Sequence, residues 1–474
     1  MKPPLCVDLD GTLLRTDLLY ESFLVALRRR PWIVFFVPFW ILAGRSVLKR
    51  RLAAIADEEL DVESLPVTDG LVAYLKAQKA EGRRIELISA SDQALVARVA
   101  ARFGDLFDHV EGSDGVTNLK ADVKAEAIAA RHTDGFVYAG NSTADDPVWK
   151  RASGSIVVND ALRRRDTVAR LAPLEAAFGD PTDTKRGLGS AMRLHQWAKN
   201  GLIFLPLLLS STYTDPATVA AAVLALFGFC LAASGTYVLN DLLDLSADRR
   251  HPTKSRRALA SGRLPVSAGL VASPALIGIG LVVAGMASGG VLACLAVYLL
   301  LTLAYSFGLK SMAVVDVVVL GALFTLRLYA GHTLVDPGTP VWLLSFSMFL
   351  FTSLALVKRL VEVRGLEARN MEGVPGRGYR AGDGVFIEVF GITTSVASVV
   401  IFMIYLAIEP AHATRLGDPG WLWVVPIMLG FWLPRVWLLA RRGEVHDDPV
   451  VFALKDPPSL LLGAIAFLAI LVSA

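Results

Sequence analysis

Hydrophobic and polar positions follow two different patterns in this 474-residue chain, one before and one after residue 190. In the first part, short apolar runs rich in strand-forming residues stand between stretches of helical character. The runs cover residues 5–10, 85–91, 135–141 and 154–159. Strands that alternate with helices predict an α/β domain built on a parallel sheet.

After residue 200 the apolar runs approach the length that spans a hydrocarbon core of about 30 Å, and only short polar breaks separate them. We predict nine transmembrane helices, the first of which is long enough only with its flanks. They cover residues 201–213, 217–241, 267–286, 289–307, 313–332, 341–359, 385–408, 420–438 and 457–473. The second part is therefore predicted to be an all-α polytopic membrane domain.

The two patterns together predict a multidomain protein. The α/β domain is expected over residues 1–172 and the membrane domain over residues 191–474. Residues 173–190 are rich in Pro, Gly, Asp and Thr, a composition typical of a linker.

Composition agrees with a membrane domain, because 54% of the residues are hydrophobic and only 19% are charged. Three scattered cysteines without a CxxC pair indicate neither a disulfide framework nor a thiolate metal site. The net charge of +3 comes with basic residues in loops beside apolar segments. This placement favours lipid head groups or phosphorylated substrates over nucleic acid as partners. The sequence leaves the oligomeric state open.

Basic residues also predict the orientation in the membrane. If the segment before residue 201 is cytoplasmic, the inside loops are residues 242–266, 308–312, 360–384 and 439–456. The first of these loops is rich in Lys and Arg, whereas the outside loops offer only Arg415. Since Lys and Arg favour the inner side, the α/β domain is predicted to be cytoplasmic, on a bacterial plasma membrane. The N-terminal residues lack the apolar core of a secretory signal.

The apolar stretch PWIVFFVPFWILAG, residues 31–44, fits neither pattern. Arginines precede it and basic residues follow it, and it is too short to cross a membrane as a straight helix. Two interpretations remain open, a buried hairpin and a segment that lies in the membrane interface.

Carboxylates follow the first predicted strand, which ends in VDLDGTLL. Asp8 and Asp10 can reach a common crevice where the chain turns at the carboxyl end of the strand. Carboxylates in such a crevice can bind Mg²⁺, which holds a phosphate. Asp8 is then suited to attack phosphorus and Asp10 to protonate the leaving oxygen.

These residues resemble the motifs of haloacid dehalogenase-like (HAD) phosphatases, over roughly residues 4–165. The resemblance implies a cap inserted at about residues 17–75 and a lysine motif at Lys124, with Lys120 as the alternative. It further implies phosphate binding by Thr12, Ser89 and Lys124, and Mg²⁺ binding by Asp8, Asp10, Asn141 and Asp145. Because Asn141 stands where the family places a carboxylate, both an active phosphatase and a regulatory or inactive domain stay open.

A second acidic motif follows the second predicted span. Asn240, Asp244 and Asp248 are spaced i, i+4, i+8, which places them along one stripe of a helix as it leaves the membrane. Divalent cations relieve the repulsion within such a stripe and can bridge it to a diphosphate. The basic residues that follow can contact phosphate oxygens, and they are Arg249, Arg250, Lys254, Arg256 and Arg257.

The stretch NDLLDLSAD resembles the aspartate-rich motif of the UbiA family of intramembrane prenyltransferases. The resemblance implies Mg²⁺ binding by Asn240, Asp241, Asp244 and Asp248, with Asp244 and Asp248 also catalytic. A second motif in YSFGLKSMAVVD implies substrate contacts from Tyr305 and Lys310 and a metal contact from Asp316. Arg249, Lys254, Arg256 and Arg257 are the further substrate contacts expected in the first loop.

Two more basic residues are candidate phosphate contacts. Arg327 lies inside the fifth predicted span, where an ionisable side chain is costly and marks a site by default. Its expected partners are a substrate phosphate or Asp316. Lys358 ends the sixth predicted span, where phosphate contact and a plain topology signal are both open.

RLHQWAKN and HPTKSRRALASG look most like the UbiA branch that transfers phosphoribose from phosphoribosyl diphosphate to a polyprenyl phosphate. The fused HAD domain is then expected to remove the phosphate of the lipid-linked product. The alternative is an aromatic prenyltransferase with a regulatory or inactive HAD domain. A transporter that uses the acidic stripe as a cation pathway is a further rival, although it predicts more ionisable residues within the spans.

Overall fold

The structure is a computed structural model that describes residues 2–56, 59–114, 119–335, 341–367, 377–408, 419–445 and 449–473. The chain forms two compact units. The first combines Met1–Met192 with Tyr237–Ser273, and the second combines Arg193–Thr236 with Pro274–Ala474. The aspartate-rich stretch therefore packs with the α/β domain, although the sequence pattern assigned it to the membrane domain.

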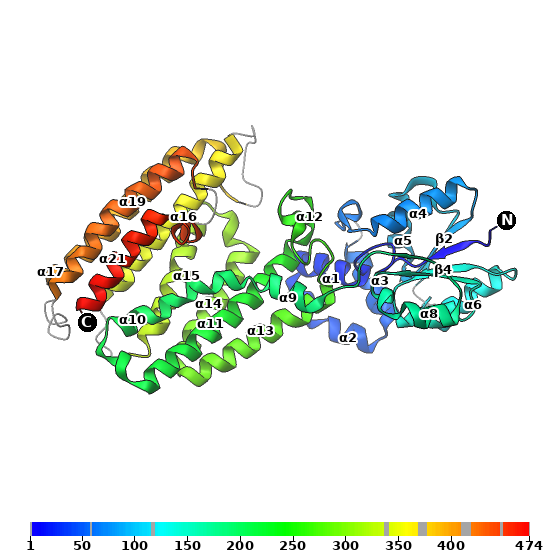
Figure 1. The fold of residues 1–474 in the computed structure, drawn as a ribbon, viewed down its shortest axis with the longest axis horizontal. Helices are drawn as coiled ribbons and strands as arrows, with labels where there is room; N and C mark the ends of the chain where they lie inside the picture. The colour runs from blue at the N-terminus through cyan, green and yellow to red at the C-terminus, as the bar shows by residue number, and fades with distance from the viewer. Residues whose placement is uncertain are drawn as a thin grey trace. The chain divides into compact units, whose positions relative to one another are not determined.

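The first unit contains a six-stranded sheet in the order β3-β2-β1-β4-β5-β6, and all its strand pairs are parallel (Figure 1). The strands are β1 (Leu5–Val7), β2 (Ile85–Asp92), β3 (His109–Ser113), β4 (Val137–Gly140), β5 (Gly154–Val158) and β6 (Leu174–Phe178). The four predicted strands are confirmed. The two edge strands were not predicted, because β3 (HVEGS) is polar and β6 (LEAAF) lies in the stretch expected to be a linker.

Helices cover both faces of this sheet. The helices α4 (Asp69–Ala80) and α5 (Gln93–Ala101) pack on one face over Leu5 and Val7. On the other face, α6 (Asp122–Arg131), α7 (Asp146–Trp149) and α8 (Arg165–Leu171) pack over Cys6 and Tyr138. Because β1 lies between β2 and β4, residues that follow these three strands share one edge of the sheet.

The insert expected after the first motif is present and helical. It consists of α1 (Leu18–Arg29), η1 (Pro31–Phe35), α2 (Val37–Leu42), α3 (Arg45–Ala56) and η2 (Val62–Ser64). Asp17 caps α1, since its Oδ1 accepts a hydrogen bond from Leu19 N at 2.8 Å. The chain then returns to the sheet through α4.

Seven helices among the described residues are long and apolar enough to cross a membrane. They are α11 (Pro216–Leu243), α13 (Val266–Ala287), α14 (Gly289–Phe307), α15 (Val315–His332), α16 (Val341–Glu367), α17 (Gly384–Ile408) and α19 (Val424–Arg442). The predicted count of nine is not confirmed. The last predicted span is α21 (Pro457–Ser473), a shorter apolar helix of 17 residues.

The first predicted span, residues 201–213, does not form one continuous helix. It is divided among η6 (Leu194–Phe204), α10 (Leu205–Leu208) and η7 (Ser211–Thr214). Pro206 lacks a backbone N–H, and the Ser210 hydroxyl caps the next turn instead of continuing the helix. Apolar composition alone therefore overestimated helix length here.

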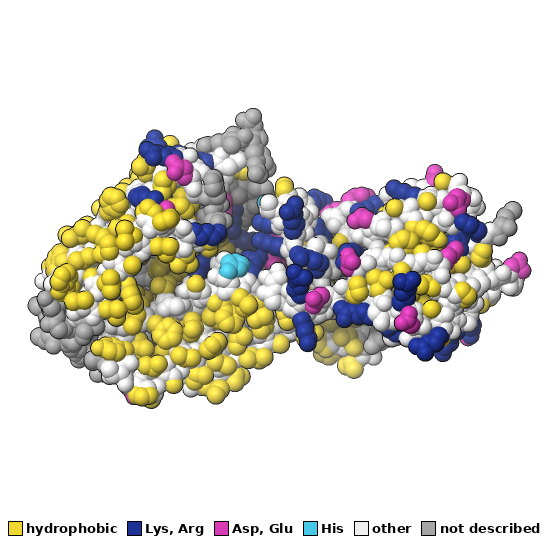
Figure 2. Space-filling view, in the orientation of Figure 1, with side chains coloured by type: hydrophobic (Ala, Val, Ile, Leu, Met, Phe, Trp, Pro, Cys, Tyr) yellow, Lys and Arg dark blue, Asp and Glu magenta, His cyan; other side chains and the backbone are white. Residues whose placement is uncertain are grey.

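Small residues allow close helix packing in the second unit. A Cβ atom on Gly280 of α13 would lie 2.7 Å from the carbonyl oxygen of Gly228 of α11, so no larger residue fits at that crossing. Such contacts are typical of membrane helices, which gain little from hydrophobic burial against each other. Figure 2 shows hydrophobic side chains spread over the exposed face of these helices, as expected for a surface in contact with lipid.

Candidate active sites

The first candidate site lies at the carboxyl end of β1, where Asp8 is buried. Lys124 from α6 places its Nζ 2.6 Å from Asp8 Oδ1, and the Thr12 hydroxyl donates to Asp8 Oδ2 at 3.4 Å. Burial raises the pKa of Asp8 to about 6, although Lys124 opposes this. Burial alone would lower the pKa of Lys124, but the Asp8 and Asp145 carboxylates hold it above its ordinary value. Lys124, rather than the exposed Lys120, therefore supplies the charge at this site.

Asp10 is held by two serines of β2. Its Oδ2 accepts hydrogen bonds from Ser91 Oγ at 2.6 Å and Ser89 Oγ at 3.1 Å, and its Oδ1 accepts from Leu18 N at 2.8 Å. The structure therefore brings the predicted Ser89 to Asp10. Ser91 was not predicted, although two residues further along a strand is the position that shares a face with Ser89.

The predicted acidic motif after β4 has a different role for each residue. Asp145 accepts hydrogen bonds from Tyr138 OH, the backbone N–H groups of Asn141 and Ser142, and Ser142 Oγ, at 2.8–3.2 Å. Its two oxygens are thus occupied in shaping the turn, so its position does not support the predicted role as a metal ligand. Asn141 instead directs Oδ1 toward the Thr12 hydroxyl at 3.3 Å.

A Mg²⁺ ion fits Asp8 and Asn141. Both side-chain oxygens lie within hydrogen-bond reach of the same Thr12 hydroxyl, so they face a common space. Gly11 makes room for the Asn141 side chain, because its φ of 74° is left-handed and a Cβ atom there would lie 2.1 Å from Asn141 Nδ2. The two side chains would supply one formal negative charge, fewer than a pair of carboxylates.

Two residues of the insert complete this site and were not predicted. Lys49 of α3 donates to the carbonyl oxygen of Ala90 at 2.6 Å, and burial lowers its pKa despite the Asp10 and Asp17 carboxylates. Burial, together with Asp10, raises the pKa of Asp17 to about 7. Neither residue belongs to a sequence motif, so only the folded insert reveals them.

A cavity of about 180 Å³ opens beside Asp10 within the first unit. Asp10, Asp17 and Asn141 line one side, and Gly262, Pro265 and Ser267 line the other. The second group directly precedes and begins α13, a candidate membrane span. The site at Asp8 and Asp10 therefore borders the end of a membrane helix.

We predict that Asp17→Asn stabilises the protein at pH 8 and has no effect below about pH 4. The pKa of Asp17 is raised from the usual value of about 4 to about 7 in the folded chain. The free energy of unfolding therefore falls as the pH rises from about 4 to about 7. Asparagine keeps the helix cap but cannot ionise. The apparent melting temperature, measured in EDTA, should rise at pH 8 by roughly 2–4 °C per kcal/mol gained. Asp183→Asn at the exposed cap of α9 (Thr184–Ala191) is the control and should show no such pH-dependent gain.

The aspartate-rich motif lies at the end of α11 and in α12 (Leu245–Arg250). The helical hydrogen bonds continue across the junction, from Asp244 N to Asn240 O at 2.9 Å and from Asp248 N to Asp244 O at 2.8 Å. Asn240, Asp244 and Asp248 therefore keep the i, i+4, i+8 spacing along a helical path, as predicted.

Arg257 joins two acids of this motif. Its Nη1 lies 3.0 Å from Asp241 Oδ1 and 2.6 Å from Asp248 Oδ2, and both carboxylates are buried. The side-chain oxygen of Asn240 is buried and accepts no hydrogen bond from any described residue. An unpartnered amide oxygen beside paired carboxylates fits a hard cation such as Mg²⁺, which Asn240, Asp241, Asp244 and Asp248 would hold. Lys254 and Arg256, in η8 (Lys254–Arg256), are exposed.

We predict that Arg257→Ala lowers the apparent melting temperature and that Mg²⁺ partly restores it. The variant removes the guanidinium that contacts the two buried carboxylates, a cost of about 1–3 kcal/mol. A bound divalent ion replaces the lost charge, so millimolar Mg²⁺ should stabilise the variant more than the wild type. Arg257→Lys, which keeps the charge, is the control. If Mg²⁺ stabilised none of the three proteins, the motif would hold no cation, and equal stabilisation of all three would show that the ion does not replace the charge of Arg257.

Arg249 does not contact the motif, contrary to the prediction that it binds phosphate. Its guanidinium forms two hydrogen bonds with Glu21 of α1, at 3.0 and 2.6 Å, and the side chains are only 4% and 3% exposed. Thr16 also donates to Glu21, at 2.5 Å. Leu24 of α1 packs beside this pair in an apolar cluster with Leu242 and Leu245. The insert is thus fixed to the aspartate-rich segment by charge and by burial.

We predict that Arg249→Ala destabilises the first unit by about 3–5 kcal/mol, because it leaves the Glu21 carboxylate buried without its partner. The neighbouring Arg250 offers a matched control, since its ion pair with Asp61 is exposed on the arginine side. Arg250→Ala should cost at most about 1 kcal/mol. Thermal unfolding of Arg249→Ala, of Glu21→Ala and of the double variant Glu21→Ala/Arg249→Ala measures the coupling, and simple additivity of the two single substitutions would contradict it.

The second predicted motif lies in the second unit and is a buried polar network. Asp316 accepts hydrogen bonds from Arg359 Nε at 2.6 Å and Tyr379 OH at 2.7 Å, and it has no exposed surface. Tyr305 accepts from Arg359 and Arg377. With Arg359 on one oxygen and Tyr379 on the other, the position of Asp316 does not support the predicted metal contact. The contacts of Arg359 and Arg377 with Tyr305 join residues far apart in the sequence and were not predicted.

Arg327 is buried within the helices of the second unit, but its partner is not Asp316. Its Nε donates to Asn200 Oδ1 at 2.7 Å and its Nη2 to Tyr298 OH at 3.1 Å. The guanidinium also lies 4.7 Å from the centre of the Tyr298 ring. These partners are neutral, so the positive charge of Arg327 stays available to an anion. Lys310, in η9 (Leu309–Ser311), and Lys358, inside α16, are half-buried.

Comparison with known families agrees with both motif sets. The model of the UbiA prenyltransferase family matches residues 202–455, and that of haloacid dehalogenase-like hydrolases matches residues 5–149. The uncharacterized protein y4nM of Sinorhizobium fredii is 38% identical over 467 residues, which is 98% of this chain and 90% of that protein.

Similarity also extends to a named enzyme and to a solved structure. The decaprenyl-phosphate phosphoribosyltransferase of Mycolicibacterium smegmatis is 36% identical over 190 residues, which is 39% of this chain and 60% of that enzyme. The structure of a UbiA homologue from Archaeoglobus fulgidus, bound to GPP and Mg²⁺, has a TM-score of 0.47 and 17% identity. That match covers 60% of this chain and 99% of the homologue.

Proposed function

The chain belongs to the UbiA prenyltransferase family and carries a haloacid dehalogenase-like domain, and we propose that it performs two consecutive reactions on one lipid. The membrane domain transfers phosphoribose from phosphoribosyl diphosphate to a polyprenyl phosphate. The HAD domain then removes the phosphate of the lipid-linked product. The transferase that is 36% identical over 190 residues supports the choice of this branch over aromatic prenyl transfer.

One observation carries the proposal: the first unit contains both acidic sites. The aspartate-rich segment packs on the HAD insert through Glu21 and Arg249, and residues Gly262, Pro265 and Ser267 line the cavity beside Asp10. A phosphatase site bordered by the start of a membrane helix suits a substrate that is anchored in lipid. We place both sites on the cytoplasmic side, as the Lys and Arg distribution favours.

The transfer step exchanges two bonds at the anomeric carbon of the donor ribose. An oxygen of the polyprenyl phosphate attacks this carbon, and the carbon–oxygen bond to diphosphate breaks. Mg²⁺, when bound, supplies positive charge that stabilises the departing diphosphate. Arg257 is placed to leave its two carboxylates and contact phosphate oxygens, and the exposed Lys254 and Arg256 lie in the same loop.

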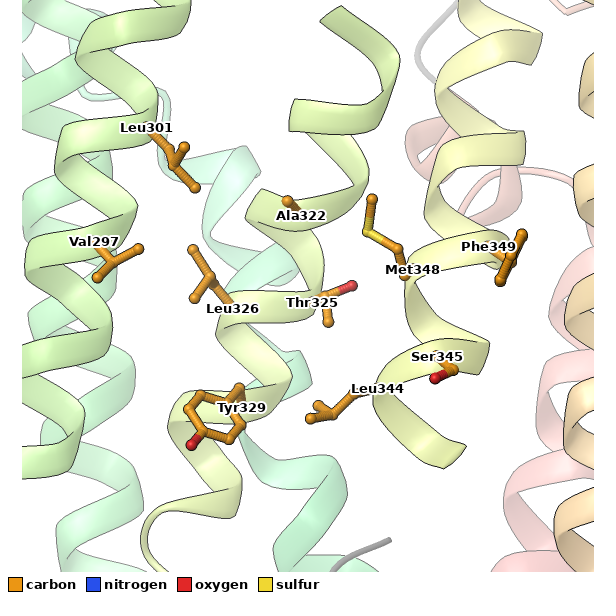
Figure 3. A pocket seen from close by; sticks show the side chains of 10 residues that line it. All are labelled: Val297, Leu301, Ala322, Thr325, Leu326, Tyr329, Leu344, Ser345, Met348 and Phe349. Atoms are coloured by element: carbon orange, nitrogen blue, oxygen red, sulfur yellow. The ribbon is translucent and has the colours of Figure 1, made fainter. Parts of the chain in front are cut away.

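The second unit offers space for a lipid chain. A cavity of about 570 Å³ lies among α14, α15 and α16, with mostly apolar walls (Figure 3). Val297, Leu326 and Met348 supply apolar surface from the three helices, and the hydroxyls of Thr325, Tyr329 and Ser345 add the few polar side-chain atoms. An open apolar groove of this kind suits isoprene units of a polyprenyl substrate.

The phosphatase step uses residues of the first unit. Asp8 attacks the phosphorus of the ribose phosphate, and Asp10 donates a proton to the departing ribose oxygen. Water then hydrolyses the aspartyl phosphate and releases inorganic phosphate. Lys124, Thr12 and Ser89 stand around the two aspartates and are suited to contact the phosphate oxygens.

Single substitutions should separate the two reactions. We predict that Asp8→Asn leaves transfer intact but lowers dephosphorylation by about a thousandfold or more, because the nucleophile is lost. The lipid product should then keep its phosphate. Asp244→Ala should lower transfer by about a hundredfold or more, because a metal ligand is lost. The measurement is the mass of the lipid formed from labelled phosphoribosyl diphosphate and decaprenyl phosphate in Mg²⁺.

A different experimental result would contradict each part of the proposal. An unchanged product mass in Asp8→Asn would exclude the phosphatase role while leaving the transferase intact. Activity only with a prenyl diphosphate and an aromatic acceptor would overturn the phosphoribosyl assignment. Membrane insertion of Asp244→Ala, measured by resistance to carbonate extraction, separates a lost reaction from a misfolded protein.

A further inference from the structure

A contiguous apolar surface projects from the HAD insert at η1 and α2. We define the apolar tip as its exposed large side chains, which are Trp32, Val34, Phe35, Phe36, Phe39, Ile41 and Leu42. Phe35 is 74% exposed and Leu42 is 85% exposed. Isolated exposed apolar residues are normal, but a group of this size marks an interaction surface.

Buried contacts with α1 and α3 hold the apolar tip in place. Ile33, between its members, is buried against Ala26 of α1 and against Leu48 and Leu52 of α3. Phe36 stacks with Trp40 at 6.4 Å, and the Arg51 guanidinium lies 5.4 Å from the Trp40 ring. The segment is therefore a short helical hairpin with one buried face. Its other face is exposed, which excludes the fully buried hairpin that the sequence left open.

The charged residues that flank the tip along the chain are all basic, although Arg29 pairs with Glu59 and Lys49 lies at the Asp10 site. Residues 22–56 contain no Asp or Glu, and their basic residues are Arg28, Arg29, Arg30, Arg45, Lys49, Arg50 and Arg51. The side chains of Arg28 and Arg30 before the tip and of Arg50 and Arg51 after it are exposed. Aromatic and aliphatic side chains flanked by arginines match the two layers of an anionic membrane surface, its acyl boundary and its head groups.

The tip also lies near the ends of two candidate spans within the first unit. Leu24 of α1 is buried with Val238 and Leu242 of α11 and with Val266 of α13. From Leu24, five helical residues lead to the end of α1 at Arg29, and the tip starts at Trp32. This stretch covers roughly 20 Å at most, so the tip stays within reach of the surface where α11 and α13 leave the membrane.

We propose that the apolar tip inserts into the interfacial layer of an anionic membrane and anchors the HAD insert there. The partner is the lipid surface itself. A second copy of the chain would bring another set of the exposed Arg28, Arg30, Arg50 and Arg51 to the apolar contact, whereas acidic head groups supply opposing charge. The inference does not depend on the substrate of either reaction.

Spin labels on the full chain test this anchor. The three native cysteines are buried, so a label reacts selectively with Phe35→Cys or Phe39→Cys. Ala77→Cys, exposed on α4 and outside the insert, is the matched control. The protein is reconstituted into vesicles of equal parts phosphatidylglycerol and phosphatidylcholine. Collision with oxygen, which dissolves in lipid, is compared with collision with a nickel chelate, which stays in water.

We expect labels at positions 35 and 39 to collide mainly with oxygen, and the label at position 77 to collide mainly with the chelate. Replacement of phosphatidylglycerol by phosphatidylcholine, or the variant Arg30→Gln/Arg50→Gln/Arg51→Gln, should shift the first two labels toward water. Chelate access at 35 and 39 equal to that at 77 would overturn the proposal. Shielding of the labels at 35 and 39 from both reagents would also overturn the proposal. Dipolar broadening of their spectra would then indicate contact with a second copy, and spectra without broadening would indicate contact within the chain.

Discussion

The buried ion pair between Glu21 and Arg249 is the constraint on which the arrangement of the first unit depends. The two residues are 228 positions apart, and neither charge has another compensating charge among its described contacts. A buried charge without its partner costs several kcal/mol, so the insert can dock on the aspartate-rich segment in few registers. Thr16 and Leu24 reinforce the same register, one by a hydrogen bond and the other by apolar packing. The cavity beside Asp10 acquires its wall of Gly262, Pro265 and Ser267 through this docking.

In both acidic sites of the first unit, a basic side chain offsets the charge of buried carboxylates. Lys124 neutralises Asp8 at the end of β1, and Arg257 neutralises Asp241 and Asp248 after α11. Each cation offsets the free-energy cost of burying carboxylates before any substrate binds. In the proposed reactions each cation also contacts phosphate oxygens, and it would then exchange a carboxylate for a phosphate without moving into a new environment. The second unit differs, because Arg359 and Tyr379 occupy the two oxygens of Asp316, whereas the described partners of Arg327 are neutral.

Local chemistry explains which parts of this molecule were predictable. Four central strands were predicted, because buried strands need apolar runs. Both acidic motifs were predicted, because the residues of VDLDGTLL and NDLLDLSAD lie close together in the sequence, at one strand end and along one short helical stretch. The edge strands were missed, since an edge needs less apolar sequence. Contacts over long sequence separation were also missed: nothing near Arg249 indicates that its partner is Glu21 instead of a phosphate. The division of residues 201–213 into short pieces shows that hydropathy measures burial in lipid and not helix continuity.

Asn141 changes the balance of the HAD site in a way that the surrounding contacts can absorb. With an amide in place of a carboxylate, a cation at Asp8 loses one charged ligand, and its affinity falls. The same change removes a negative charge from the path of an incoming phosphate, which already faces Asp8 and Asp10. Lys124 stays protonated because Asp8 and Asp145 hold its pKa above the ordinary value, so positive charge at the site does not depend on the metal alone. Weaker metal binding and weaker repulsion of a phosphate substrate thus oppose each other, and under the proposed function the ammonium of Lys124 supplies the attraction that does not depend on the metal.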